Sequence, residues 1–335
     1  MIQTVWGIMH FLKSLVLISP YIIPIMHWMM RACLKMCTMH FRKQYIPISV
    51  VVFSLFFSGC VYTEQKVSSF VPHISISSST TTTPAVVFPF QGNVTTSLFI
   101  AHAGGTVLSD DVNGTGTNSK EALDDSYASG FRFVEMDFSL TRDGTLFLFH
   151  DGSERYIGLD TLIGETDYDE FMGRRFQGKY TLMDLTDLLK YLLEHDNLYI
   201  ITDFKSDFYS SVNTLLSHDI FRQHPELKQR FIIQIYEPEQ LNQVEQGGFE
   251  HIIFTLYRTP LTDDEVLAFI QEHVSIDAVA MWWNDRYTDA FAKAIMQEGC
   301  FVYVHTINER SVIDQFFQKS VGVYTDYIDV NTYAL

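Results

Sequence analysis

The chain has few cysteines, which limits the ways in which it could be cross-linked. Cys33, Cys37 and Cys60 lie in the first 60 residues, and only Cys300 lies in the remainder. A disulfide framework is therefore excluded for residues 61–335. The close pair Cys33 and Cys37 is not followed by a second Cys or His pair with suitable spacing, so we do not expect a zinc site there.

Basic residues are also scarce outside the N-terminal segment. Residues 1–60 contain five Lys or Arg and no Asp or Glu, whereas residues 61–335 contain 18 Lys or Arg against 40 Asp or Glu. Such an acidic body repels polyanions, which argues against nucleic acid as a partner. An anionic substrate would have to be attracted locally, by a bound divalent cation or by a few basic side chains.

The apolar run at residues 45–58 is short compared with the ~20 residues of a permanent membrane span. Arg42 and Lys43 precede this run, and Gly59 and Cys60 follow it. This pattern resembles a bacterial lipoprotein signal, in which the cysteine is lipidated and becomes the mature N-terminus. We therefore expect export and membrane anchoring through Cys60, on the periplasmic or cell-surface side.

The residues on either side of this signal require separate interpretations. Since such a signal does not normally begin 60 residues before its cysteine, we expect translation to start at Met39; a further membrane segment over residues 6–30 is the alternative. Residues 61–96 include the polar run Ser77-Ser78-Ser79-Thr80-Thr81-Thr82-Thr83 and are expected to be a flexible linker. The folded domain is expected over residues 97–335.

From residue 97 onward, short apolar strands alternate with amphipathic helices. Thr181 with Asp184, and Thr262 with Glu265, predict two helix starts. The pattern predicts a (β/α)8 TIM barrel, with an open doubly wound sheet as the alternative. A run at 145–149 follows a turn signal and predicts a small β-hairpin insertion after strand 2. The eight barrel strands are expected at 97–102, 131–138, 198–204, 230–236, 251–257, 276–282, 300–306 and 321–325.

Acidic residues cluster at the ends of two of these strands, where a barrel places its active site. Glu135 and Asp137 share one face of their strand, while Val134 and Met136 point toward the helices. Neighbouring carboxylates repel each other unless a cation lies between them. Asp203, on the third strand, can supply a third oxygen ligand. A divalent metal site is expected here; simple solvation of charged strand ends is the alternative.

Histidines and a lysine accompany the acidic residues. His102 ends the first strand and His150 ends the hairpin, so together they can move protons at neutral pH. Lys205 is expected to neutralise a phosphate oxygen, or else to pair with Asp203. Gly104 permits the backbone to approach a phosphate. These residue types favour metal-assisted cleavage of a phosphodiester.

The order of these residues resembles that of the glycerophosphodiester phosphodiesterase family. The family pattern has His-Arg-Gly after strand one, Glu-x-Asp on strand two, Thr-x-Asp-Gly and His-Asp after it, and Glu-x-Lys on strand three. The resemblance covers residues 98–327, and it is specific because the matching residues occur together and in the family order. The matching residues are His102, Asn118, Glu135, Asp137, Thr141, Asp143, Gly144, His150, Asp151, Lys205, Thr306, Asn308, Thr325 and Asp326.

The resemblance implies a barrel that binds Ca²⁺ or Mg²⁺ and hydrolyses glycerophosphodiesters to glycerol 3-phosphate and an alcohol. His102 and His150 then look like the catalytic pair. The implied metal ligands are Glu135, Asp137 and Asp203, and the implied substrate or phosphate contacts are Lys205, Gly104, Asn118, Trp282 and His305.

The sequence departs from the family pattern at three positions. Ala103 replaces the arginine expected to contact phosphate, Asp203 is one methylene shorter than the usual glutamate, and His305 replaces a tryptophan of the substrate pocket. Two other functions therefore stay open. One is a lipid phosphodiesterase of the phospholipase type, for which Trp282 and Trp283 could form an apolar rim; the other is a non-catalytic, surface-tethered binding lipoprotein.

Overall fold

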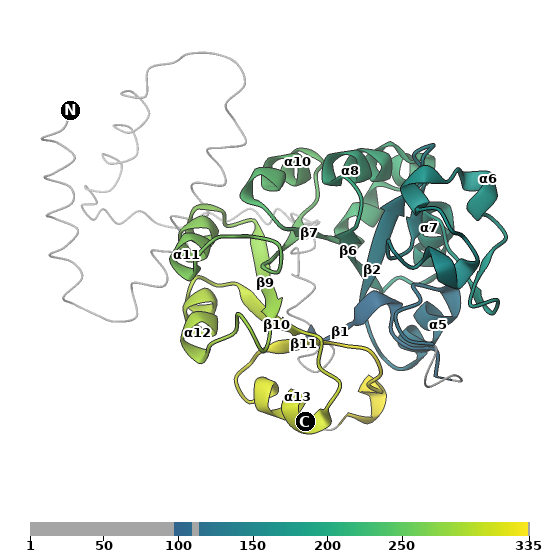
Figure 1. Ribbon diagram of the computed structural model, residues 1–335. Helices are drawn as coiled ribbons and strands as arrows, with labels where there is room; N and C mark the ends of the chain where they lie inside the picture. Colours follow the sequence, from purple (N-terminus) through teal and green to yellow (C-terminus); the bar gives the residue numbers. More distant parts are fainter. Residues whose placement is uncertain (1–96, 109–113, 334–335) are drawn as a thin grey trace, which may run out of the picture. The chain divides into compact units, whose positions relative to one another are not determined.

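The computed structural model describes residues 97–108 and 114–333, and its centre is a ring of eight parallel strands (Figure 1). Each strand pairs with the next one along the chain, and β1 pairs with both β2 and β11, which closes the ring. The predicted (β/α)8 barrel is thus confirmed, and the open sheet is excluded. The barrel strands are β1 (Phe99–Ala101), β2 (Phe133–Leu140), β6 (Tyr199–Phe204), β7 (Phe231–Ile235), β8 (His251–Thr255), β9 (Ile276–Trp282), β10 (Phe301–His305) and β11 (Gly322–Thr325).

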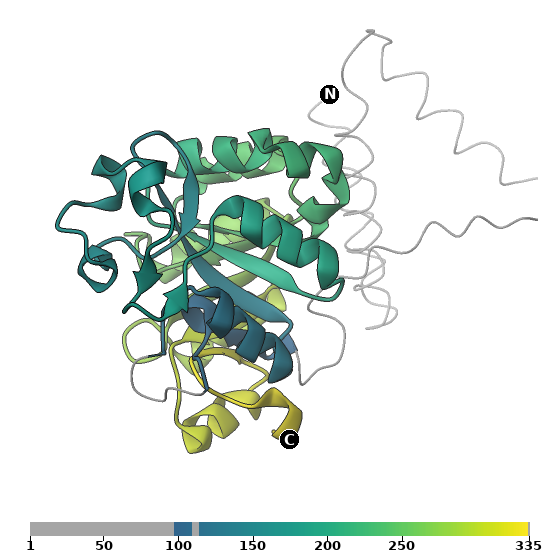
Figure 2. The same cartoon turned by 90° about the vertical axis from the view of Figure 1, so that its right-hand side faces the viewer.

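Helices lie outside this ring, and Figure 2 shows them around the barrel from the side. The outward-facing residues of β2, Val134, Met136 and Phe138, are fully buried in the core between the strands and the helices. Together with short 3₁₀ turns, the helices that the structure describes are α5 (Lys120–Ala128), α6 (Tyr168–Phe171), α7 (Leu185–Glu194), α8 (Phe208–Ser217), α9 (Asp219–Gln223), α10 (Leu241–Gln246), α11 (Asp263–Glu272), α12 (Asp289–Gln297) and α13 (Arg310–Phe317).

Two predicted helix starts have different outcomes. Thr262 and Glu265 form the expected reciprocal cap of α11. The prediction that Thr181 opens α7 is wrong, because Asp184 caps this helix together with Asp187. Thr181 instead pairs with Arg175 in a separate two-stranded ribbon, β4 (Arg175–Phe176) and β5 (Tyr180–Thr181).

The hairpin predicted after strand 2 is present, since β3 (Leu146–Leu148) runs antiparallel to the end of β2. The insertion is larger than expected, however. Between β3 and α7 it also contains two 3₁₀ turns, α6 and the β4–β5 ribbon. Phe147, Phe149, Phe171 and Phe176 form much of a small apolar core of its own. Its segments are too short to show a clear hydrophobic period, which is why the sequence did not reveal them.

The interior of the barrel is filled by apolar and aromatic side chains. Tyr303 is fully buried there, and its ring crosses β11 at Gly322, where a Cβ atom would lie 2.3 Å from the ring. Because side chains alternate along a strand, the next inward residue lies two positions closer to the C-terminal mouth. The interior set is Ile100, Phe133, Ile201, Ile232, Ile253, Ala278, Ala280, Tyr303 and Tyr324.

The predicted signal segment (1–60) and linker (61–96) lie outside the described residues. Within the part of the chain that the structure describes, no helix combines the length and apolar character needed to cross a bilayer.

Candidate active site

Three buried carboxylates meet at the mouth of the barrel, each on the inner face of its strand. Glu135 and Asp137 come from β2, and Asp203 comes from β6 as the register partner of Asp137. One oxygen from each lies within 4.8 Å of the others. The three residues are only 2%, 2% and 7% exposed. The expected convergence of these acids is therefore present.

Hydrogen bonds orient two of the carboxylates from the β1 side of the mouth. The backbone N–H of Ala103 donates to Oε2 of Glu135 at 2.7 Å. The amide of Asn118 donates to Oδ2 of Asp137 at 2.7 Å, and its oxygen accepts from the Asp137 N–H at 2.9 Å. Asn118 is 1% exposed, and both groups of its amide position Asp137.

Asp203 is oriented by two tyrosines from the next strands of the ring. The hydroxyl of Tyr236 donates to Oδ1 of Asp203, and the hydroxyl of Tyr257 lies 3.1 Å from both carboxylate oxygens. Burial raises the pKa of both phenols, and the neighbouring Asp203 charge raises it further, so the phenols stay protonated as donors.

Lys205 partly offsets the negative charge of the cluster. Its ammonium group lies 3.0 Å from Oδ1 of Asp137 and 2.6 Å from Oδ2 of Asp203, so the ion pair with Asp203, the alternative to a phosphate contact, is present. Burial opposes the charged form of Lys205, but the Asp137 and Asp203 charges outweigh it and raise its pKa. Burial likewise works against ionisation of Asp203, yet Lys205 holds the pKa of Asp203 below its ordinary value.

Glu135 lacks a comparable cation. Burial, followed by the charge of Asp137, raises the pKa of Glu135 to about 8. Its Oε1 atom is buried and has no hydrogen-bond partner among the described residues. A buried acceptor without a partner costs ~1–3 kcal/mol, more when it is charged. Three converging carboxylates with one free oxygen fit a hard divalent cation, which prefers oxygen ligands.

His102 faces this cluster from the end of β1. Its Nδ1–H donates to Oδ1 of Asp326 at 2.8 Å, and Asn308 in turn donates to Oδ2 of Asp326 at 2.5 Å. Desolvation disfavours the imidazolium, but the bond to Asp326 and the charges of Glu135 and Asp137 outweigh it and raise the pKa of His102 to about 9. His102 is thus oriented and protonated beside the acids.

A small cavity of about 40 Å³ lies among His102, Glu135, Asp203 and neighbouring polar residues that include His305. Burial, and then the charge of His102, lower the pKa of His305 to about 4, so its ring is neutral. Its Nε2 atom is buried and lacks a partner among the described residues. The Trp282 ring lies 4.5 Å from the His305 ring, so Trp282 extends this wall toward solvent.

Two other predicted site residues, His150 and Gly104, make no described hydrogen bond to the three carboxylates. The amide of Phe149, next to His150, donates to the carbonyl of Asp137, but the His150 side chain is exposed and its Nδ1 lies 2.7 Å from the carbonyl oxygen of Asp151. Gly104 is buried with a φ of 82°, and a Cβ there would lie 3.4 Å from the backbone of Asn118. Gly104 therefore allows close packing of the loop.

Sequence reasoning did not include several residues of this site in its candidate set. They are Tyr236, Tyr257 and Arg258, all just after the C-terminal ends of strands, together with Asp326, which matched the family pattern but was given no role in the site. The signal that could have found Asp326 and Tyr257 is the strand period, because they lie two positions beyond the inward residues Tyr324 and Thr255.

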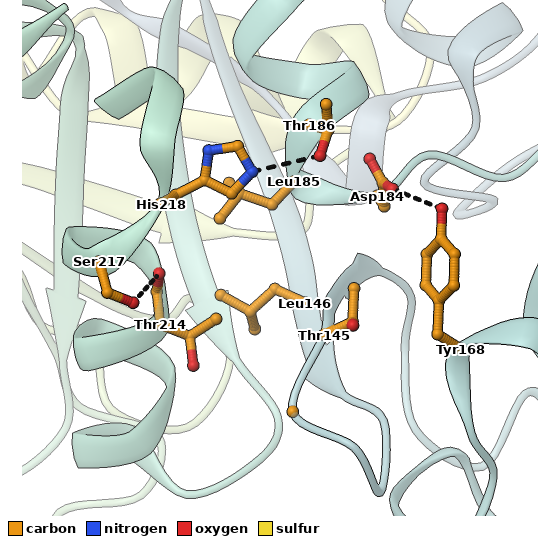
Figure 3. Close-up of a pocket in the computed structure, with 10 residues that line it drawn as sticks. Thr145, Leu146, Tyr168, Asp184, Leu185, Thr186, Thr214, Ser217 and His218 are labelled. Atoms are coloured by element: carbon orange, nitrogen blue, oxygen red, sulfur yellow. Dashed lines mark hydrogen bonds between the residues drawn. The ribbon is translucent and has the colours of Figure 1, made fainter. Parts of the chain in front are cut away.

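A larger hollow of about 370 Å³ lies elsewhere, between the insertion, the start of α7 and the end of α8 (Figure 3). Tyr168 donates to Asp184 there, and Thr186 lies 3.2 Å from Nε2 of His218. None of the candidate site residues lines it. Size alone therefore does not identify the reactive centre; the convergence of acids and His102 does.

Comparison with known proteins agrees with this geometry. The family model described as the glycerophosphoryl diester phosphodiesterase family matches residues 108–330, about two thirds of the chain. No curated protein matches the chain.

Several solved structures share the fold. A phosphodiesterase from Oleispira antarctica, in complex with the product sn-glycerol-3-phosphate, is 18% identical, with a TM-score of 0.55 over 69% of this chain and 93% of that one. Glycerophosphodiester phosphodiesterases from Thermotoga maritima (17%, TM-score 0.54, 70% and 95%) and Agrobacterium tumefaciens (14%, 0.53, 69% and 97%) are similar. The chain belongs to the glycerophosphoryl diester phosphodiesterase family and is an enzyme of the phosphodiester hydrolase class.

Proposed function

We propose that this chain hydrolyses glycerophosphodiesters to glycerol 3-phosphate and an alcohol, with Ca²⁺ or Mg²⁺ held by Glu135, Asp137 and Asp203. The observation that carries the proposal is the convergence of these acids beside His102. The bound ion would supply a Lewis acid that offsets the charge of the diester.

The two histidines divide the proton transfers in this proposal. His102 carries a proton, and its Nδ1–H is bound to Asp326, so Nε2–H is the group that protonates the leaving alkoxide. The Nδ1 atom of His150 lies 2.7 Å from the carbonyl oxygen of Asp151, and in the tautomer that donates from Nδ1 the Nε2 atom accepts a proton from the attacking oxygen. That oxygen belongs to water or to a neighbouring glycerol hydroxyl.

The substrate side of the proposal places His305 and Trp282 against the diester. His305 offers a neutral ring with a free Nε2, and Trp282, which is 43% exposed, gives an aromatic wall at the mouth. Assay of the purified chain on glycerophosphocholine and glycerophosphoethanolamine, read by release of glycerol 3-phosphate, and on a lysophospholipid, read by release of lysophosphatidic acid or monoacylglycerol, tests the activity. Turnover of the first two is expected. Turnover of the lysophospholipid alone would favour the lipid phosphodiesterase, and binding without turnover would favour the non-catalytic alternative.

The metal-free protein should lose stability as the pH rises from about 6.5 to about 9, because below about 6.5 the opposite contribution of His305, whose pKa is lowered to about 4, offsets that of Glu135. The pKa of Glu135 is about 8 against an ordinary 4.5, and that of His102 is about 9 against 6.5. Between each pair of values the group concerned binds more protons in the folded protein than in the unfolded chain, so the free energy of unfolding falls with rising pH in this range. Thermal unfolding in a chelating buffer measures this fall. Glu135→Gln should flatten its lower part, and an unchanged slope would contradict the assignment.

We also propose that the chain is exported and anchored to a membrane through a lipid on Cys60, with residues 61–96 as the linker. The support is the sequence pattern of Arg42, Lys43 and the apolar run that ends before Cys60. Cys60→Ser should prevent lipid attachment, and the mature protein should lose the lipid mass that peptide mass spectrometry detects. Cys300→Ser, which changes the cysteine of the folded domain, is the control and should keep the lipid mass. Recovery of peptides from residues 1–38 in the mature wild type would contradict the expected start and processing.

A further inference from the structure

The residues assigned so far include no lysine or arginine that is free to contact the phosphate of the substrate. Ala103 stands where the family pattern has an arginine. Lys205, the basic residue within the cluster, is already bound to Asp137 and Asp203. An arginine from another part of the mouth could fill this role, since its planar fork of N–H groups matches phosphate oxygens.

Arg258 lies beside the cluster, in the segment that follows β8. Its guanidinium carbon is 4.4 Å from the ring centroid of Tyr236 and 5.1 Å from that of Tyr257. Both tyrosines hydrogen-bond Asp203 through their hydroxyls. Arg258 also donates from Nη1 to the carbonyl oxygen of Phe204, the residue after Asp203, at 3.3 Å. The guanidinium is therefore fixed next to a proposed metal ligand.

Arg258 forms no ion pair with an Asp or Glu side chain in the described part of the chain. Arg142, Arg222 and Arg286 each form an ion pair with an aspartate, whereas Arg258 forms none there. Its side chain is exposed, and its one described hydrogen bond leaves the remaining N–H groups for a ligand. Stacking on two rings limits its freedom, so less entropy is lost when an anion binds.

We propose that Arg258 binds the phosphate group of the diester substrate and of the glycerol 3-phosphate product, and so replaces the arginine that is absent at position 103. This inference rests on the proposed function. It assigns a binding role to Arg258, while proton transfer stays with the histidines.

The test compares Arg258→Gln, which removes the charge, with Arg258→Lys, which keeps the charge but loses the fork. A charged hydrogen bond of ordinary strength predicts that Arg258→Gln raises KM for glycerophosphocholine and Kd for glycerol 3-phosphate by ~10–100-fold, with a smaller change in kcat. Arg258→Lys should recover part of the loss. Both constants are measured on the full-length chain in detergent with Ca²⁺ or Mg²⁺, and Kd is measured by calorimetry.

The control is Arg222→Gln, an exposed arginine of α9 that pairs with Asp219, and it should leave both constants unchanged. Thermal unfolding of each variant separates loss of binding from loss of folding. If KM and Kd of Arg258→Gln stay within twofold of the wild-type values, the inference is overturned. Turnover by the wild type would still uphold the proposed function in that case. If the wild type binds glycerol 3-phosphate in a way that depends on Arg258 but turns over no diester, the inference is upheld and the proposed function is overturned. Absence of both turnover and product binding in the wild type would overturn both proposals.

Discussion

Glu135→Gln should reduce diester hydrolysis by at least ~10³-fold, because it removes a proposed ligand of the divalent ion without changing the volume of the side chain. The variant should still fold. Glu135 is 2% exposed and lies beside Asp137, so a neutral amide relieves repulsion in the metal-free protein. Initial rates of glycerol 3-phosphate release, with saturating Ca²⁺ or Mg²⁺, give the comparison.

Glu272→Gln is the matched control for this loss. Glu272 is the exposed last residue of α11, and the same chemical change there should leave the rate at the wild-type value. A Glu135→Gln variant that retains more than a tenth of the wild-type rate would remove Glu135 from the proposed metal site.

His102→Asn should lower kcat by ~10²–10⁴-fold on substrates with an alkyl alcohol as leaving group. Such an alcohol must be protonated as it departs, and the His102 imidazolium held by Asp326 is the proposed donor. On a nitrophenyl diester, whose leaving group is stable as an anion, the same variant should show a much smaller loss of kcat. The ratio of the two rates therefore identifies the general acid.

His150→Asn supplies the contrast, since loss of a general base should slow both substrates to a similar extent. His224→Asn is the control, because His224 is partly exposed and pairs with Glu226 away from the carboxylates. Equal losses on both substrates for His102→Asn would show that His102 does not protonate the leaving group.

Much of the carboxylate cluster could be predicted because it follows from local strand geometry. Glu135 and Asp137 share a face by alternation, and Asp203 ends the next barrel strand. The parallel register of β2 and β6 then brings Asp137 and Asp203 to the same level. The fold itself was predictable from the regular alternation of strands and helices.

The partners that orient the site could not be predicted in the same way. Asp326 and His102 are 224 positions apart, and they meet only because β11 closes the ring against β1. Tyr236 and Tyr257 look in the sequence like core aromatics at strand ends. Only the register of β7 and β8 shows that their hydroxyls donate to Asp203.

The insertion could not be predicted for a different reason. Its helices and strands have two to four residues each, too few for a hydrophobic period. Its stability comes instead from a local cluster of aromatic rings, such as Phe147 against Phe171 at 4.7 Å. Such packing is a tertiary property, so the sequence pattern indicated only the first hairpin.

Calorimetric titration of the metal-free, full-length chain with Ca²⁺ and with Mg²⁺ tests the central claim most directly. The account predicts one bound ion per wild-type chain for at least one of these metals, and no saturable binding by Glu135→Gln. A wild-type chain that binds neither ion, or a Glu135→Gln variant that binds as tightly as the wild type, would contradict it.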